Sequence, residues 1–225
     1  MIKKSNLLFI IFLAFLLSYN QNSERGWESL SLEEKIGQMI MVRVNGNYYQ
    51  SDNRYKNLLE KWISDKHIGG VITFTGNIHG TFYNIKQFQK WSEIPLFVAA
   101  DYERGLGQWM NSATLFPSNM AVAATGNPEY AFQQGLITSS EAKHIGVNIV
   151  LAPVLDINNN PDNPIINFRA YSDDPSIVSQ FGNAFINGIQ KNNIFACAKH
   201  FPGHGNTSVD SHTSLPSIPG SKNEL

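Results

Sequence analysis

Residues Lys199 to His212 read KHFPGHGNTSVDSH, and they directly follow the short apolar run from Ile194 to Ala198. An apolar run of this length, bounded by turn residues, predicts a buried strand, so the polar residues begin where the strand ends. Pro202, Gly203 and Gly205 exclude a continuing helix and predict a shaped loop. Loops at strand ends are held above a packed core, where α/β folds usually place their active sites. We therefore expect the chemistry of this protein to lie here.

Asp210 and His212 are the two side chains of this loop that best suit proton transfer. They are separated by one residue, so on an extended or turning backbone both can point into one cleft. A carboxylate beside an imidazole fixes the tautomer of the ring and stabilises its protonated form. An isolated Asp-x-His triplet is most often a surface turn, but the histidines and the lysine in the same loop favour a site. We predict that His212 donates and accepts a proton with Asp210 beside it.

The whole stretch resembles the signature of glycoside hydrolase family 3, and specifically its β-N-acetylhexosaminidase branch. Members of that branch carry a Lys-His-Phe-Pro-Gly-His-Gly run followed by Asp-Ser-His, and this sequence has both at the matching spacing. The β-glucosidase branch shares Lys-His-Phe but usually lacks Asp-Ser-His. The resemblance implies that His212 is the general acid/base, paired with Asp210. It also implies that Lys199 and His200 hold sugar hydroxyls.

Two further stretches resemble the same family and imply more contacts to the sugar. Asp101 follows a predicted strand and resembles the first Asp of the family's acidic motif, which binds sugar hydroxyls. The segment around Arg169 resembles another family motif, and a guanidinium can donate to vicinal hydroxyls in a fixed fork. Trp109 stands where relatives often have an arginine, and its ring can instead stack on a pyranose face.

The resemblance further implies retaining hydrolysis of terminal β-linked N-acetylhexosamine, with a covalent glycosyl-enzyme, an aspartate nucleophile and a separate acid/base. In the family the nucleophile lies beyond the equivalent of Leu225, so we leave that role unassigned and do not give it to Asp156 or Asp101. Three alternatives stay open: a noncatalytic sugar-binding derivative, a β-glucosidase, and a phosphorylase that uses phosphate as the acceptor.

Strand-like and helix-like segments alternate along the chain about five times. Ser31 and Glu34 form a capping box that predicts the start of the first helix. Predicted helices cover residues 31–38, 54–66, 82–91, 129–144 and 175–191, and predicted strands cover 39–44, 70–74, 95–100, 147–154 and 194–198. This alternation predicts a parallel sheet and, in its closed form, a (β/α)8 TIM-barrel-type domain.

The number of βα units is smaller than a full barrel needs, since a typical barrel takes about 250 residues. We expect residues 26–225 to be a partial glycoside hydrolase family 3 N-terminal catalytic domain, truncated after about five βα units and inactive alone. An open doubly wound sheet is the structural alternative. No Gly-x-Gly-x-x-Gly follows the first predicted strand, so dinucleotide binding has no support.

Residues 1–25 have the pattern of a signal peptide or N-terminal anchor. Lys3 and Lys4 precede an apolar run from Leu7 to Leu17, after which the chain turns polar. The apolar run is too short to cross a bilayer comfortably. We expect a secreted or periplasmic protein that touches a membrane only through an uncleaved signal.

The resemblance implies a carbohydrate partner, an N-acetylglucosamine-containing glycoside, and composition gives no support for nucleic acid. The formal net charge is -1 and no basic run is present, so neither nucleic acid nor an anionic membrane surface is an expected partner. The single cysteine, Cys197, excludes a disulfide framework and is predicted to be buried in its strand. Met39 and Met41 are predicted to be core strand residues.

No cofactor and no metal are expected. His200 and His204 are four residues apart, but Pro202 and Gly203 prevent the helix that would bring both imidazoles to one face. The Asn-rich segment 158–163 is predicted to be a loop beside the site without chemistry of its own.

Overall fold

The computed structural model describes residues 26–217, so the N-terminal segment predicted to be a signal lies outside the described residues. The helices are η1 (Trp27–Ser29), α2 (Leu32–Gln38), α3 (Arg54–Ser64), α4 (Ile78–Trp91), η2 (Leu106–Gln108), α5 (Asn119–Ala123), α6 (Glu129–Ile145), η3 (Asn167–Arg169) and α7 (Pro175–Gln190). The strands are β1 (Met41–Gly46), β2 (Gly70–Asn77), β3 (Phe97–Ala100), β4 (Met110–Asn111), β5 (Ile149–Val150) and β6 (Phe195–Ala196).

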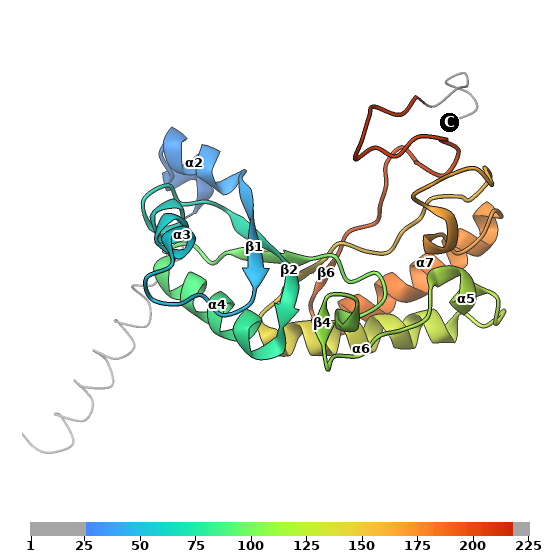
Figure 1. The fold of residues 1–225 in the computed structure, drawn as a ribbon, viewed down its shortest axis with the longest axis horizontal. Coiled ribbons are helices and arrows are strands. Elements are labelled where there is room, and N and C mark those ends of the chain that lie inside the picture. The colour runs from blue at the N-terminus through green and yellow to red at the C-terminus, as the bar shows by residue number, and fades with distance from the viewer. Residues whose placement is uncertain (1–25, 218–225) are drawn as a thin grey trace, which may run out of the picture.

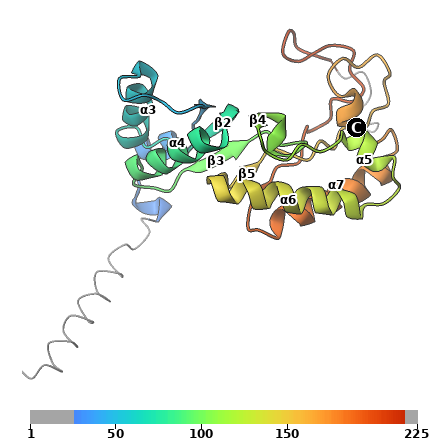
Figure 2. The ribbon, with the colours of Figure 1, turned by 60° about the horizontal axis from the view of Figure 1, so that its bottom comes forward.

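The strands form one parallel sheet in the order β1-β2-β3-β5-β6, with β4 paired to β2. Strands that are neighbours in the sheet are joined by segments that carry α3, α4, α6 or α7, as in the βα units of a barrel. Figures 1 and 2 show these helices along one side of the curved sheet. The predicted barrel-type α/β architecture is therefore confirmed.

Local sequence signals set the helix starts as predicted. The Ser31 backbone N–H donates to Glu34 Oε2 at 2.7 Å and the Glu34 N–H donates to Ser31 Oγ at 3.2 Å, which is the capping box at the start of α2. Asp174 Oδ1 accepts from the Ser176 N–H at 2.7 Å, with Pro175 as the first residue of α7. Both helices thus begin where side chains satisfy otherwise unpaired backbone donors.

The hydrophobic core lies between the sheet and the helices. Val71, Val98 and Val150 are fully buried on this face, whereas Phe97 and Phe195 point to the opposite, concave face. Their rings contact each other there with centroids 6.1 Å apart and are 48% and 61% exposed. No layer of other described residues covers this part of the concave face.

Three positions predicted to be in the core are exposed, so these predictions are wrong. Cys197 is exposed, because it follows β6 at the uncovered side of the sheet. Met41 on β1 is exposed, and Met39, the C-cap residue that follows α2, is 85% exposed. An apolar run predicts a strand, but it does not say which faces of that strand another layer covers.

The fourth and fifth predicted strands are much shorter than the apolar runs that predict them. Pro153 has no N–H for the ladder, so regular pairing of β5 ends early. The two segments nevertheless stay side by side: the Lys199 N–H donates to Pro153 O at 3.0 Å and the Leu155 N–H donates to Lys199 O at 2.6 Å. This irregular pairing places Lys199 at the strand-end edge of the sheet.

Within residues 26–217, we find no helix that is long and apolar enough to cross a membrane.

Candidate active site

Two carboxylates and two cations meet at the carboxyl ends of the strands and form what we call the charge cluster: Asp101, Glu103, Arg169 and Lys199. Lys199 Nζ lies 2.5 Å from Asp101 Oδ1 and 2.6 Å from Glu103 Oε1. Asp101 and Glu103 follow β3, Arg169 ends η3, and Lys199 follows β6. The structure therefore brings together three residues that the sequence predicted for sugar binding, and it adds Glu103.

Glu103 is the centre of the charge cluster, although the sequence did not single it out. Its side chain is only 4% exposed and is the shared acceptor for both cations. Burial alone would raise the pKa of Glu103, but the hydrogen bonds and charges of Arg169 and Lys199 outweigh burial and lower this pKa to about 2. Its position two residues after Asp101, at a strand end, was the only local signal.

All three guanidinium nitrogens of Arg169 donate hydrogen bonds to other groups of the protein. Nε donates to Glu103 Oε2 at 3.0 Å, Nη2 donates to Glu103 Oε1 at 2.7 Å, and Nη1 donates to the Ile165 carbonyl at 3.0 Å. The hydrogen bond to Glu103 is the main reason that the pKa of Arg169 is raised. The geometry assigns Arg169 first to holding Glu103, and direct contact with a sugar stays a prediction.

Asp156 and His200 form a second acid–imidazole pair beside the charge cluster. His200 Nδ1 lies 2.5 Å from Asp156 Oδ2, and the His204 backbone N–H donates to Asp156 Oδ1 at 2.6 Å. From the sequence, Asp156 was considered only as a nucleophile, and it was left unassigned. Its partners lie more than forty residues later in the chain, at separations of 44 and 48 residues, so no local pattern revealed them.

The segment 158–163, predicted to have no chemistry, anchors the loop that contains His204. Asn163 is buried, and its Nδ2 donates to the carbonyls of His204 at 2.7 Å and Thr207 at 2.9 Å. Gly205 lies against the Ile157 carbonyl so closely that a Cβ would come within 1.8 Å of that oxygen. The segment that follows β5 thus fixes the start of the loop that carries the predicted acid/base.

Asp210 and His212 form the predicted pair. His212 Nδ1 lies 2.7 Å from Asp210 Oδ1, and the His212 backbone N–H donates to the same oxygen at 2.9 Å. These hydrogen bonds, the backbone one first, lower the pKa of Asp210. The His212 side chain is 74% exposed, and Figure 1 shows this last described segment standing away from the sheet. Within residues 26–217, no hydrogen bond or ion pair joins this pair to the charge cluster.

Trp109 is held beneath the charge cluster. Its Nε1 donates to the Asp101 carbonyl at 2.7 Å, and its ring meets Phe74 edge-on with centroids 5.7 Å apart. The indole therefore supports the backbone of Asp101. Stacking of Trp109 on a pyranose face stays a prediction.

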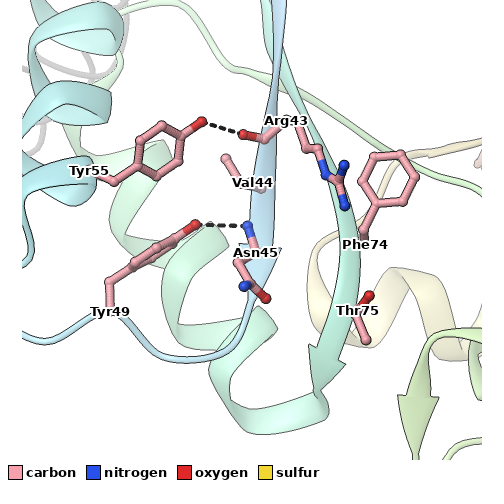
Figure 3. A pocket seen from close by; sticks show the side chains of 7 residues that line it. All are labelled: Arg43, Val44, Asn45, Tyr49, Tyr55, Phe74 and Thr75. Carbon is pink, nitrogen blue, oxygen red and sulfur yellow. Dashed lines mark hydrogen bonds between the residues drawn. The ribbon is translucent and has the colours of Figure 1, made fainter.

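A pocket of about 370 Å³ lies at the outer edge of β1 and not over the charge cluster. Figure 3 shows Tyr49 and Tyr55 on one side of β1, with Arg43 and Phe74 on the other. The Tyr55 hydroxyl donates to Arg43 O at 2.6 Å, and the Asn45 N–H donates to the Tyr49 hydroxyl at 2.7 Å. These tyrosines cap the free backbone edge of β1, so we do not assign the pocket to the substrate.

In the part of the chain that the structure describes, no three His, Cys, Asp or Glu side chains are grouped so that they could hold a metal ion. The imidazoles of His200 and His204 are nearly perpendicular, with ring centroids 6.2 Å apart.

Comparison with known proteins identifies the family. Residues 31–225 match the glycosyl hydrolase family 3 N terminal domain. Beta-hexosaminidase A of Pseudoalteromonas piscicida is 36% identical over 180 residues, which cover 74% of this chain and 30% of that protein.

Two solved structures have the same fold. A glycoside hydrolase family 3 beta-N-acetylglucosaminidase from Paenibacillus sp. str. FPU-7 superposes with a TM-score of 0.79 at 34% identity, covering 87% of this chain and 38% of the other. A beta-glucoside phosphorylase superposes with a TM-score of 0.74 at 32% identity, covering 82% and 32%. The chain spans less than half the length of each of these three proteins. The charge cluster and the Lys199–His212 loop both lie inside the matched region. The match over residues 31–225 shows that the chain belongs to glycosyl hydrolase family 3.

Proposed function

We propose that the complete gene product carrying this chain hydrolyses terminal β-linked N-acetylhexosamine residues with retention of configuration. The observation that carries the proposal is the hydrogen-bonded pair of Asp210 and His212 on the loop that follows β6. Binding a sugar needs no such pair, whereas departure of an alkoxide leaving group needs a proton donor. The names of the relatives, a beta-hexosaminidase and a beta-N-acetylglucosaminidase among them, support the same substrate class.

In the proposed reaction, the charge cluster binds the hydroxyls of the sugar. Asp101 is partly exposed and can accept from sugar hydroxyls, and Lys199 has a third N–H beyond the two that face Asp101 and Glu103. Charge-assisted hydrogen bonds of this kind are the stronger ones and hold a sugar ring in one orientation. His212, with its ring fixed by Asp210, then donates the proton to the leaving oxygen and later accepts one from the incoming acceptor.

The nucleophile is not assigned within this chain. Retaining hydrolysis needs a carboxylate that forms the covalent glycosyl-enzyme. The described carboxylates in contact with the proposed sugar-binding residues are already engaged. Asp101 pairs with Lys199, and Glu103 pairs with both Lys199 and Arg169. Asp156 is buried and is held by His200 and the His204 backbone N–H. A carboxylate held in two charge-assisted hydrogen bonds is a weak nucleophile, so Glu103 does not suit the role.

Phosphate is the second candidate acceptor. A neutral imidazole does not repel an anion as a second carboxylate would, and one structural relative is named a beta-glucoside phosphorylase. An assay of the complete gene product on para-nitrophenyl β-N-acetylglucosaminide and β-glucoside, each with and without phosphate, separates the candidates. Free N-acetylglucosamine as the product supports hydrolysis, and a sugar phosphate supports phosphorolysis. If neither glycoside is turned over, the result supports a noncatalytic sugar-binding protein.

We also propose export from the cytoplasm, because Lys3 and Lys4 followed by the apolar run from Leu7 to Leu17 have the pattern of a secretory signal. Cell fractionation and N-terminal sequencing of the mature protein test this proposal. Recovery of the protein in the cytoplasm with its N-terminus intact would contradict it.

A further inference from the structure

Asp156 is a fully buried carboxylate that lies outside the charge cluster. Its side chain is 0% exposed, and its two oxygens have different partners. Oδ1 accepts from the His204 backbone N–H at 2.6 Å, and Oδ2 lies 2.5 Å from His200 Nδ1. A buried carboxylate is costly unless donors surround it, so both contacts favour partners that donate.

The contact with Asp156 determines which ring nitrogen of His200 carries the proton. A carboxylate only accepts hydrogen bonds, so Nδ1 must carry the hydrogen between them. In the neutral ring Nε2 is then an acceptor. The His200 side chain is 36% exposed, and among residues 26–217 its Nε2 has no hydrogen-bond partner. The acceptor nitrogen is therefore free for a ligand.

The neighbouring side chain has the opposite polarity. Lys199 can only donate, and two of its three N–H groups face Asp101 and Glu103. One donor therefore remains on Lys199, the residue directly before His200 in the chain. A hydroxyl group both donates and accepts, so a free donor on Lys199 and a free acceptor on His200 suit the hydroxyls of a sugar.

We propose that Asp156 is a positioning residue that holds His200 as a hydrogen-bond acceptor for a sugar hydroxyl. The inference rests on the proposed function, and it adds the direction of the His200 contact and the residue that sets it. Asp156 acts only through His200, because its own oxygens are buried and both are already engaged.

The variant Asp156→Asn reverses the direction of this hydrogen bond. The amide oxygen must stay against the His204 N–H, because an NH2 group there would place donor against donor. The amide NH2 therefore faces His200 Nδ1, which loses its hydrogen, and the proton moves to Nε2. His200 becomes a donor toward the ligand.

Nitrogen NMR on the complete gene product, labelled with nitrogen-15 in histidine only, reads the tautomer directly. Spectra are recorded at alkaline pH, where the rings are neutral, and His200→Gln identifies the His200 signals. We expect a protonated Nδ1 and an unprotonated Nε2 in the wild type, and the reverse in Asp156→Asn. An unprotonated Nδ1 in the wild type, which needs no variant to fold, would overturn the proposal.

Asn163→Ala is the matched control. It removes the side chain that donates to the carbonyls of His204 and Thr207, so it loosens the same loop without touching Asp156 or His200. We expect its His200 signals to keep the wild-type pattern. If Asn163→Ala switched the tautomer as Asp156→Asn does, general loosening and not Asp156 would set the ring.

Calorimetric titration with N-acetylglucosamine tests the sugar contact. We expect Asp156→Asn to bind about tenfold more weakly, since a lost acceptor leaves a hydroxyl facing a donor. Unchanged affinity together with a switched tautomer would overturn the acceptor role of His200. If the wild type itself binds no sugar, the proposed function fails, while the NMR spectra still decide whether Asp156 sets the ring.

Discussion

Arg169 holds Glu103 in a two-pronged hydrogen bond, from Nε to Oε2 at 3.0 Å and from Nη2 to Oε1 at 2.7 Å. The two residues are separated by 66 positions in the chain. Paired donors of this kind fix the plane of the carboxylate as well as its charge. Lys199 shares the same Oε1 at 2.6 Å, so its ammonium group is fixed between Glu103 and Asp101. The position of the proposed sugar-binding lysine therefore depends on a residue that touches no sugar.

Glu103→Gln should destabilise the domain strongly. The amide lacks the negative charge and one of the two acceptor oxygens, and its NH2 group faces a cation, so Arg169 and Lys199 stay partly buried with their charges poorly compensated. This costs about 3 kcal/mol or more. Urea unfolding of the complete gene product measures the change. The matched control is Glu33→Gln, which breaks the exposed ion pair with Lys66 and should cost less than about 1 kcal/mol. Equal losses in the two variants would show that Glu103 is not the centre of the cluster.

Acid should reveal the same interaction. The pKa of Glu103 is lowered from 4.5 to about 2, so folding favours its ionised form. Its contribution, roughly 3 kcal/mol, is present above pH 4.5 and is lost as the pH falls toward 2. The stability difference between the wild type and Glu103→Gln should therefore shrink across this range. A difference that stays constant with pH would contradict the lowered pKa.

His212→Ala should slow hydrolysis most for substrates with poor leaving groups. Such groups need a proton as they depart, whereas an activated aryloxide leaves readily without one. Rates on a series of aryl β-N-acetylglucosaminides measure the dependence on leaving-group acidity. His144→Ala, which removes an exposed imidazole on α6, is the control and should behave as the wild type. Equal losses for all leaving groups would exclude proton transfer by His212.

Asp101→Asn and Arg169→Ala should differ in their effects on sugar affinity and on the stability of the fold. The Asp101 side chain is partly exposed and is not the main partner of Arg169, so its loss should weaken sugar binding by about 1.5 to 3 kcal/mol with little change in stability. Arg169→Ala should weaken binding and also lower the free energy of unfolding, because Glu103 loses its paired donor. Calorimetry and urea unfolding measure both quantities. Intact sugar binding in Asp101→Asn would remove Asp101 from the site.

The sequence predicted the parts of the site that depend on local order along the chain. Ser31 starts its helix as expected, because capping involves residues only two or three positions apart, and Asp174 caps α7 by the same local rule. Asp210 and His212 form their hydrogen bond for the same reason. Asp101 and Lys199 could be expected together, because parallel strands bring their carboxyl ends to one edge of the sheet.

The missed features depend on contacts across the fold. No local pattern around Glu103 indicates that Arg169 and Lys199 both contact it. In the same way, no pattern around Asp156 indicates its contacts with His200 and His204. Burial was also misjudged, since Cys197 lies in an apolar run and yet is exposed. Periodicity indicates the type of an element, whereas exposure depends on which other elements cover it.

The separation of the cluster residues along the chain has a kinetic consequence. Asp101 and Lys199 are in contact although 98 positions separate them in the chain. Closing such a long loop costs chain entropy, so contacts of this kind form late in folding. During synthesis Lys199 is also made last of the four, so Glu103 has only Arg169 as a cation partner until then. The geometry of the proposed sugar-binding site should therefore appear at the end of folding, after the helices have formed. Recovery of N-acetylglucosamine binding during refolding would report completion of the whole sheet, and it should lag behind the return of helical circular dichroism.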